Sequence, residues 1–258
     1  MLKQDDKNFD DLIDQFKQRI YNTEKGEWRL KLLLEDLKVI FDTNQQISFL
    51  DAGCGFAQIS QLLVEKGHQG ILCDISGKML QQAEVTFAQS NLTANFKQLS
   101  FQELLPELPD LDLILFHAVM EWLAQPMQGL ESVSKKVKPG GYLSVLFYNR
   151  NAMVYSNVLK GGWRLRPILD DAYIGKGSKL TPPNPQYPHD VETCLHEQGF
   201  SVIAHTGIRV FHDYLHDNNL QKTSTDELFE LEASYCRMPV YRDMGRYVHM
   251  LAQKKPEL

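Results

Sequence analysis

Ile47-Ser-Phe-Leu-Asp51-Ala-Gly53-Cys-Gly55-Phe-Ala57 is the stretch that decides the fold of this 258-residue chain. An apolar run leads directly into an acidic residue and a glycine-rich turn, a pattern typical of a β-strand that feeds a nucleotide-binding loop. Glycine is needed there because the backbone must turn sharply and approach a ligand that a Cβ atom would push away. A second apolar run ends at Asp74, about 20 residues after the glycines, where an acid can bind ribose hydroxyls. The two pieces together predict a nucleotide site.

The end of the loop indicates which nucleotide fits. The dinucleotide fingerprint requires a glycine three places after its second glycine, and Gln58 occupies that place. We therefore expect NAD to fit poorly. The form acid-x-Gly-x-Gly-x-small instead resembles the loop of class I methyltransferases, which bind S-adenosylmethionine, a ligand without phosphates. Ala57 stands at the small position, where that pattern usually has a third glycine.

Apolar runs alternate with helical patterns along the chain, and this alternation predicts βαβ units and a parallel sheet. The expected strands are 47–50, 70–73, 96–99, 111–116 and 142–147, with two more at 200–208 and 246–252. The turn Lys138-Pro-Gly-Gly141 is expected to separate a helix from the fifth strand. We predict an α/β, Rossmann-like fold of the class I methyltransferase type, with a seven-stranded, mostly parallel sheet and helices on both faces. N-terminal helices and insertions after strands 5 and 6 complete it.

Length and composition favour one domain over residues 1–258. Apolar residues at helical spacing between positions 9 and 21 predict an amphipathic helix, so we expect 1–45 to form an N-terminal helical lid. A hydrophobic content of 43% and a charged content of 23% are those of a soluble globular protein. No apolar stretch is long enough to span a bilayer, and the first residues lack the apolar core of a signal peptide. We expect a cytoplasmic protein with no membrane partner.

The four cysteines have neither CxxC spacing nor histidine neighbours of the zinc-site type. Reduced thiols and no metal are therefore expected. Cys54 is interpreted as a small residue whose backbone faces the cofactor, with a redox role as the less favoured alternative.

The connection at 148–190 is too long for an ordinary loop, and we predict a basic substrate-binding insertion there. Residues 148–181 contain six Lys or Arg against two Asp, a net charge of +4, so the rest of a chain of net charge −6 carries −10. Such an excess is ordinarily a solvated face, but it is also where an anionic ligand would be steered. Arg164 and Arg166 are its candidate substrate contacts. The overall acidity argues against a general nucleic-acid binder.

Candidate contacts near the predicted strand ends each have a structural alternative. Asp74 is expected to bind ribose, and the alternative is a helix cap. His117 ends the fourth strand at the edge where open α/β sheets bind ligands, and the alternative is a structural histidine. Arg29 is expected at the start of a helix, where its charge opposes the dipole and calls for a carboxylate partner; a solvated surface charge is the alternative.

Phe101 and Gln102 follow the third strand, at a point where this fold commonly has an acid that contacts the adenine amino group. The acid is missing. The amide of Gln102 can both accept from and donate to adenine, and Phe101 can stack on it. A plain turn is the alternative.

Strings spread over nearly the whole chain match one known family. They are Asn8-Phe-Asp-Asp11, Asp74-Ile-Ser76, Leu113-Ile-Leu-Phe-His-Ala118 with Glu121-Trp122, Phe147-Tyr-Asn149, Gly207-Ile-Arg-Val-Phe-His-Asp-Tyr-Leu215, and Tyr235-Cys-Arg237 with Gly245-Arg-Tyr247. In these strings the chain resembles the bacterial tRNA 5-carboxymethoxyuridine methyltransferases. The strings at 147–149 and 209–215 are specific to that family.

The resemblance implies methylation of the terminal carboxylate of 5-carboxymethoxyuridine at the wobble position of tRNA, with S-adenosylmethionine as cofactor and the anticodon stem-loop as partner. It places cofactor contacts on Arg29, Gly53, Cys54, Asp74, Phe101, Gln102 and His117. A carboxylate with a reference pKa near 4 is already ionised at neutral pH, so we expect no catalytic acid or base. The carboxylate still needs a positive clamp, for which Tyr148, Arg209, His212 and Arg246 are candidates.

Two other classes of function share parts of this pattern. A small-molecule carboxyl or hydroxyl O-methyltransferase would use the same cofactor half without needing the basic insertion. A noncatalytic module that binds S-adenosylmethionine or RNA would transfer no methyl group.

Overall fold

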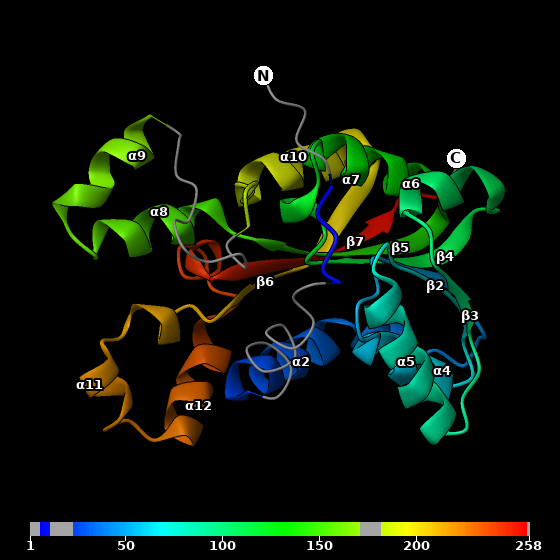
Figure 1. Ribbon diagram of the computed structural model, residues 1–258, viewed down its shortest axis with the longest axis horizontal. Helices are drawn as coiled ribbons and strands as arrows, with labels where there is room; N and C mark the ends of the chain where they lie inside the picture. The colour runs from blue at the N-terminus through cyan, green and yellow to red at the C-terminus, as the bar shows by residue number, and fades with distance from the viewer. Residues whose placement is uncertain (1–5, 11–22, 171–181, 257–258) are drawn as a thin grey trace.

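The structure is a computed structural model that describes residues 6–10, 23–170 and 182–256. A single sheet of seven strands forms its centre, in the order β3-β2-β1-β4-β5-β7-β6 (Figure 1). The strands are β1 Ser48–Ala52, β2 Gln69–Cys73, β3 Asn95–Lys97, β4 Leu111–His117, β5 Val137–Tyr148, β6 Phe200–Ile208 and β7 Tyr247–Lys254. Strands β1 to β5 pair in parallel, whereas β7 is antiparallel to both β5 and β6. The predicted seven-stranded, mostly parallel sheet is confirmed.

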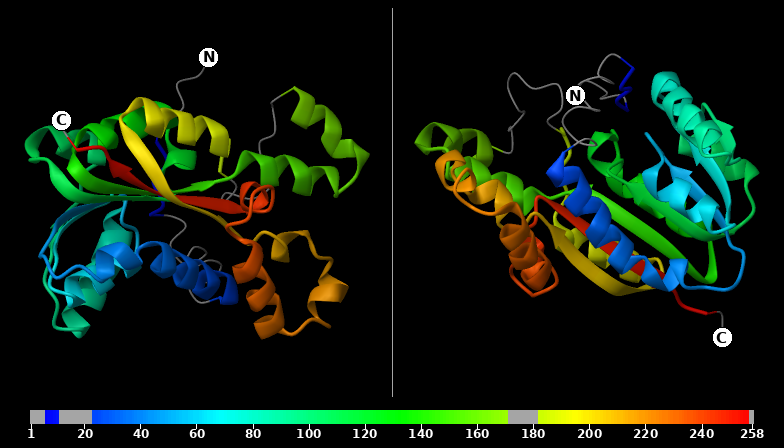
Figure 2. Two further views of the ribbon diagram at one scale, coloured as in Figure 1. Left: turned by 180° about the vertical axis from the view of Figure 1, so that it is seen from behind. Right: turned by 90° about the horizontal axis from the view of Figure 1, so that it is seen from below.

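Helices cover both faces of the sheet (Figures 1 and 2). One layer holds α2 Glu24–Asp36, α3 Lys38–Phe41, α4 Gln58–Glu65 and α5 Gly77–Gln89, and the other holds α6 Phe101–Leu104, α7 Pro126–Lys135 and α10 Pro188–Glu197. Strand β4 shows why two layers form: Leu113 and Leu115 lie in the core cluster under the first layer, and Ile114 and Phe116 lie in the cluster under the second. Side chains alternate along a strand, so the apolar run at 113–116 requires a cover on each face.

Two insertions lie together at one end of the molecule, opposite α4 and α5 (Figure 1). The insertion after β5 contains α8 Arg150–Val158, the 3₁₀ turn η4 Gly162–Arg164 and α9 Leu165–Leu169; we call residues 150–169 the arm. The insertion after β6 contains η5 His212–Tyr214, α11 Asp217–Leu220, α12 Thr225–Tyr235 and η6 Arg242–Met244. Two further 3₁₀ turns, η2 Leu105–Glu107 and η3 Met120–Trp122, flank β4.

Several predicted boundaries were wrong. Lys138-Pro-Gly-Gly141 does not precede the fifth strand but lies inside β5, where the pairing with β4 shifts between Leu111 and Leu113. Gly140 has a φ of +77°, which a bulge accepts and a regular strand does not. The third strand ends at Lys97, not at 99, and Leu99 is 39% exposed.

The expected N-terminal lid is only partly described. The helix predicted between positions 9 and 21 lies outside the described residues from position 11 onward. The helix expected to start near Arg29 is present as α2 and α3, which are separated at Leu37. No helix among residues 6–10, 23–170 and 182–256 has the length and apolar character needed to cross a membrane.

Candidate active site

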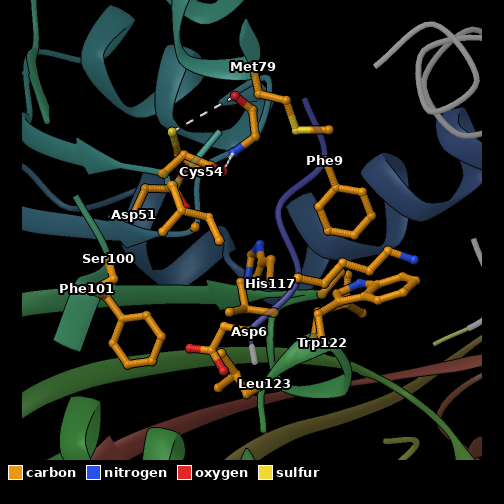
Figure 3. A pocket seen from close by; sticks show the side chains of 18 of the residues that line it. Asp6, Phe9, Asp51, Cys54, Met79, Ser100, Phe101, His117, Trp122 and Leu123 are labelled. Carbon is orange, nitrogen blue, oxygen red and sulfur yellow. Dashed lines mark hydrogen bonds between the residues drawn. The ribbon is translucent and has the colours of Figure 1, made fainter. Parts of the chain in front are cut away.

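A pocket opens over the carboxyl ends of β1, β2 and β4, the edge at which open α/β sheets bind ligands. The loop after β1 lines it with Gly53, Cys54 and Gly55, and the loop after β2 adds Asp74. Ser100, Phe101 and Gln102 line it after β3, His117, Ala118 and Val119 line it from the end of β4, and Arg29 lines it from α2 (Figure 3). All seven residues predicted to contact the cofactor therefore line one pocket.

The backbone of the loop after β1 explains its small residues. Gly53 has a φ of +80°, and a Cβ atom there would lie 2.5 Å from Cγ2 of Val119. Ala57 precedes α4 with a φ of +54°, in the left-handed region that favours glycine. Ala57 thus adopts the backbone conformation that the usual third glycine would adopt, and this conformation strains the alanine locally.

Asp74 ties this loop to the end of β2. Its Oδ2 accepts from the amide of Gly55 at 2.9 Å, and its Oδ1 accepts from the amide of Ser76 at 2.8 Å. The alternative interpretation of Asp74 as the cap of the next helix is wrong, because the hydroxyl of Ser76 caps α5. Burial raises the pKa of Asp74, and its two backbone donors oppose that shift.

Asp51 and Cys54 are buried below the loop. Burial raises the pKa of Asp51 to about 7, although the hydroxyl of Ser60 donates to its carboxylate. Burial likewise raises the pKa of the Cys54 thiol well above its ordinary value, with the nearby carboxylates of Asp51 and Asp74 adding to the shift. A thiol held in this form is a poor nucleophile, which favours the interpretation of Cys54 as a small residue. Within the described ranges, no three His, Cys, Asp or Glu side chains group as a metal site.

Phe101 and Gln102 begin α6, which Ser100 and Glu103 cap reciprocally. The Phe101 ring is 4% exposed and packs edge-to-face on Phe116 at a centroid distance of 5.2 Å. The Gln102 amide donates to Oδ2 of Asp6 at 2.9 Å. The residues predicted to contact adenine are thus held by the core on one side and by the N-terminal segment on the other.

Residues 6–10, which we call the strap, cross the pocket mouth (Figure 3). On the β4 side, Asp6 accepts from the amide of Ala124 at 2.8 Å, and Phe9 packs edge-to-face on Trp122. On the β2 side, Asn8 donates to the carbonyl of Ile75 at 3.0 Å, and Asp10 accepts from the hydroxyl of Ser76 at 2.6 Å. The strap therefore joins the two sides of the pocket. The strand and helix patterns used to predict the site did not predict the polar contacts of the strap.

Two of the predicted contacts have surroundings that differ from the expectation. Arg29 does not start its helix, because Thr23 caps α2 and Glu24 and Glu27 occupy the first turn; the helix-dipole argument for a partner was therefore wrong. His117 ends β4 as predicted, and its Nε2 lies 2.7 Å from Oγ of Ser144. Burial, together with the nearby His249 and Arg29, holds the pKa of His117 well below its usual range, so the ring is neutral.

A second group of predicted residues gathers around a carboxylate that the sequence did not single out, Asp213. Its Oδ2 lies 3.3 Å from Nη2 of Arg209 and 3.6 Å from Nε of Arg246, and its Oδ1 lies 3.0 Å from Nδ1 of His212. The Arg246 guanidinium lies over the Tyr148 ring, 4.9 Å from its centroid. We call these five residues the Asp213 cluster. It unites the four predicted carboxylate contacts.

Tyr247 and Glu121 connect the Asp213 cluster with the pocket. The guanidinium of Arg209 lies 5.6 Å from the centroid of the Tyr247 ring, and Glu121 and Arg29 both act on the pKa of Tyr247. Glu121 is fully buried. Burial raises its pKa to about 8, so Glu121 is mostly protonated at neutral pH. It lies in the 3₁₀ turn η3, before α7 begins at Pro126.

Backbone strain marks both halves of the site. Ala118, directly after β4, has a φ of +56°, and Arg209, directly after β6, has a φ of +60°. Left-handed conformations of residues other than glycine cost energy and concentrate at functional sites. Here they occur where the chain leaves the sheet beside the pocket and beside the Asp213 cluster.

The structure does not place Arg164 and Arg166 with the other candidates. They lie on the arm, where the Arg164 guanidinium stacks on Trp163 at 3.8 Å and Arg166 pairs with Asp170 at 2.9 Å. Trp163 is 69% exposed. The arm therefore presents an exposed aromatic ring beside positive charges. None of its residues lines the pocket.

Comparisons with known proteins agree with this geometry. Residues 50–145 match the family model described as a methyltransferase domain. The chain is 37% identical to the tRNA 5-carboxymethoxyuridine methyltransferase of Escherichia coli (strain K12), over 96% of this chain and 97% of that protein. Among solved structures, a SAM-dependent methyltransferase from Archaeoglobus fulgidus matches with a TM-score of 0.60 at 18% identity, covering 94% of this chain and all of that one. The magnesium protoporphyrin IX methyltransferase of Synechocystis PCC 6803, with bound SAH, matches with a TM-score of 0.59 at 15% identity, covering 96% of each chain. The structural likeness confirms the predicted fold.

Proposed function

Because the chain belongs to the family of tRNA 5-carboxymethoxyuridine methyltransferases, we propose that it methylates the terminal carboxylate of 5-carboxymethoxyuridine at the wobble position of tRNA. The product is the methyl ester, and the methyl donor is S-adenosylmethionine. The observation that carries the proposal is the pairing of a nucleotide pocket with the arginines of the Asp213 cluster at the same edge of the sheet. A tRNA substrate would place the protein in the cytoplasm.

The residues of the pocket fit S-adenosylmethionine, whose sulfonium makes its methyl group electrophilic. Buried carboxylates at Asp51 and Asp74 suit a ligand with cationic groups, and Asp74 stands where ribose hydroxyls can be bound. Phe101 and Gln102 offer an apolar face and an amide for adenine. Arg29 is the pocket arginine for the methionyl carboxylate. Gln58 leaves no third glycine for a pyrophosphate, which argues against NAD.

The chemistry at the acceptor requires alignment and no proton removal. A carboxylate oxygen is already nucleophilic at neutral pH. It carries no proton that a base such as the neutral ring of His117 would have to remove. The protein must hold this oxygen in line with the methyl group and keep water out. We therefore assign no residue the role of general acid or base.

The Asp213 cluster can supply the clamp for the substrate carboxylate. Arg209 and Arg246 carry two positive charges and Asp213 one negative charge, and Lys25 lies 3.7 Å from Oδ1 of Asp213, so a net positive charge remains for an incoming anion. All three side chains are at least two-thirds buried, at 15%, 26% and 13% exposure, so a bound carboxylate would feel little solvent screening. The Tyr148 ring lies under the Arg246 guanidinium, and His212 contacts the Asp213 carboxylate that pairs with both arginines.

The arm can bind the anticodon loop. Single-stranded RNA is recognised by stacking splayed bases on aromatic rings and arginine planes, and Trp163 with Arg164 provides such a surface. Arg150 and Lys160 belong to the same segment, in a chain that is acidic overall. The arm would thus attract phosphates, while the Asp213 cluster selects the modified base.

Mass spectrometry of wobble nucleosides tests the proposed function. In tRNA from cells that lack the protein, we expect the methyl ester of 5-carboxymethoxyuridine to disappear and the free acid to accumulate. Expression of the wild-type chain should restore the ester, and expression of Asp74→Ala, as a cofactor-site control, should restore less of it. Unchanged levels of the ester in the deletion strain would contradict the proposal.

A further inference from the structure

A chain of hydrogen bonds runs through the interior from α2 to the pocket. Oδ2 of Asp36 lies 2.7 Å from Nδ1 of His249, Nε2 of His249 lies 2.8 Å from Oγ of Ser144, and the same Oγ lies 2.7 Å from Nε2 of His117. Ser144 and His249 are fully buried. At the far end, Arg237 donates to Oδ1 of Asp36 at 2.7 Å and 3.1 Å. None of the steps proposed above uses Asp36, Ser144 or His249.

The sequence of groups resembles the carboxylate, imidazole and hydroxyl of a hydrolase, but it cannot serve as one. A nucleophilic serine must reach a substrate, whereas Ser144 has no exposed surface. Its oxygen also has a histidine on either side. The chain therefore ends on the ring of His117, which lines the pocket (Figure 3).

The number of available protons determines which group donates and which accepts at each step of this hydrogen-bond chain. Burial opposes ionisation of Asp36, but the hydrogen bond from His249 and the charge of Arg237, which donates to Asp36 twice, stabilise the carboxylate and lower the pKa of Asp36. An ionised carboxylate only accepts, so Nδ1 of His249 carries a proton. Asp36 already pairs with Arg237, so a second proton on His249 would add an uncompensated charge to the interior, which is costly. Nε2 of His249 therefore accepts the single hydroxyl proton of Ser144. The Ser144 oxygen can then only accept from Nε2 of His117.

We propose that Asp36, His249 and Ser144 are positioning residues that hold His117 as its Nε2–H tautomer, with the lone pair of Nδ1 left as an acceptor for the cofactor. A neutral acceptor suits the ammonium or hydroxyl donors of S-adenosylmethionine, and a fixed tautomer keeps that acceptor in place. The assignment of the ligand rests on the proposed function, whereas the tautomer of His117 does not.

Nitrogen-15 NMR of histidine-labelled protein, recorded without cofactor or tRNA, tests the tautomers. In the wild type we expect Nε2–H for His117 and Nδ1–H for His249. In Asp36→Asn, the amide oxygen can still accept from Arg237 while the amide nitrogen donates to Nδ1 of His249. His249 then becomes Nε2–H, the Ser144 hydroxyl reverses, and His117 inverts to Nδ1–H.

Ser144→Ala supplies a second variant that removes both bonds to the hydroxyl. It should leave His117 as a mixture of tautomers while His249 stays bonded to Asp36. Ser134→Ala is the matched control, since Ser134 is also buried but its hydroxyl bonds only to the Leu130 carbonyl in α7; His117 should be unchanged in it. Nδ1–H on His117 in the wild type, or a tautomer unaffected by both test variants, would overturn the proposal.

Calorimetry with S-adenosylmethionine then tests the role of the lone pair. We expect about tenfold weaker binding for Asp36→Asn, roughly the loss of one hydrogen bond plus an opposed donor, and wild-type affinity for Ser134→Ala. Inverted tautomers with unchanged affinity would overturn the role toward the cofactor. A wild type that fails to bind S-adenosylmethionine would contradict the proposed function and leave the NMR result standing.

Discussion

Nη2 of Arg209 lies 3.3 Å from Oδ2 of Asp213, and the backbone of Arg209 adopts the left-handed conformation with a φ of +60°. The two side chains are 15% and 13% exposed. The ion pair therefore fixes a guanidinium that the chain presents from a strained position at the end of β6. Its strength can be measured separately from any reaction.

Asp213→Asn should destabilise the fold by roughly 1 to 3 kcal/mol at neutral pH, the usual value of hydrogen bonds to charged groups. Burial raises the pKa of Asp213, but Arg209, His212, Arg246 and Lys25 outweigh it and hold that pKa far below its ordinary value. A carboxyl with a lowered folded pKa stabilises the protein above its unfolded pKa and loses that contribution as the pH falls. Urea unfolding should thus show a steeper loss of stability below about pH 4 in the wild type than in the variant. Parallel pH profiles would contradict this role.

Arg209→Gln and Arg246→Gln should each lower kcat/KM for the modified tRNA. The expected loss corresponds to about 2 to 4 kcal/mol of transition-state stabilisation, the cost of leaving a buried charge unpaired. Affinity for S-adenosylmethionine should not change, because neither arginine lines the pocket. Arg242→Gln is the control: Arg242 lies in η6 and pairs only loosely with Asp243, at 3.8 Å. If steady-state kinetics give all three variants the wild-type kcat/KM, Arg209 and Arg246 do not clamp the substrate carboxylate.

Asp74→Ala should weaken binding of S-adenosylmethionine by roughly 1 to 3 kcal/mol, because it removes charge-assisted bonds to ribose and frees the loop at Gly55. Asp112→Ala provides a control of the same chemistry at the opposite end of the sheet, where Asp112 accepts from Ser48. Isothermal titration calorimetry should detect the loss only in the first variant. Equal affinities would limit Asp74 to a structural role.

Replacing Arg164 and Arg166 together with glutamine should lower the salt slope of tRNA binding by up to about 2 units, since each neutralised phosphate contact contributes about one. Both arginines lie on the arm, and no residue of the arm lines the cofactor pocket, so cofactor affinity should stay constant. Lys38→Gln with Lys66→Gln, two lysines of the α2–α4 layer, controls for net charge. If the arginine substitutions leave the salt slope unchanged, the basic residues of the arm are a solvated face that does not contact tRNA phosphates.

The sequence predicted the sheet because each strand is a local pattern, and the strands at 200–208 and 111–116 were placed within one residue of their bounds. Pairing is not local. The bulge at Lys138-Pro-Gly-Gly141 looks like a turn in sequence, and only its pairing with β4 makes it part of a strand. The start of α2 was also misplaced, because the cap at Thr23 lies in a polar stretch without apolar periodicity.

The pocket residues were predictable because parallel strands bring their carboxyl ends to one edge. Four members of the Asp213 cluster were predicted as candidates for one clamp, but Asp213 itself was not. Tyr148 contacts Arg246, and Arg246 shares Asp213 with Arg209, because β7 lies between β5 and β6 in the sheet; no local pattern gives that order. The buried chain from Asp36 to His117 likewise joins residues more than 200 positions apart at one step, where sequence spacing carries no signal.

Methyl transfer by the purified protein to three tRNAs, at saturating cofactor, tests the central claim most directly. The tRNAs carry 5-carboxymethoxyuridine, 5-hydroxyuridine or unmodified uridine at the wobble position. We expect transfer only to the first, at a rate nearly flat from about pH 6 to 8, because no group of the enzyme must first lose a proton. Equal methylation of the hydroxyl-bearing tRNA, or a rate that rises steeply with pH, would contradict the carboxylate assignment and favour a hydroxyl methyltransferase that needs a base.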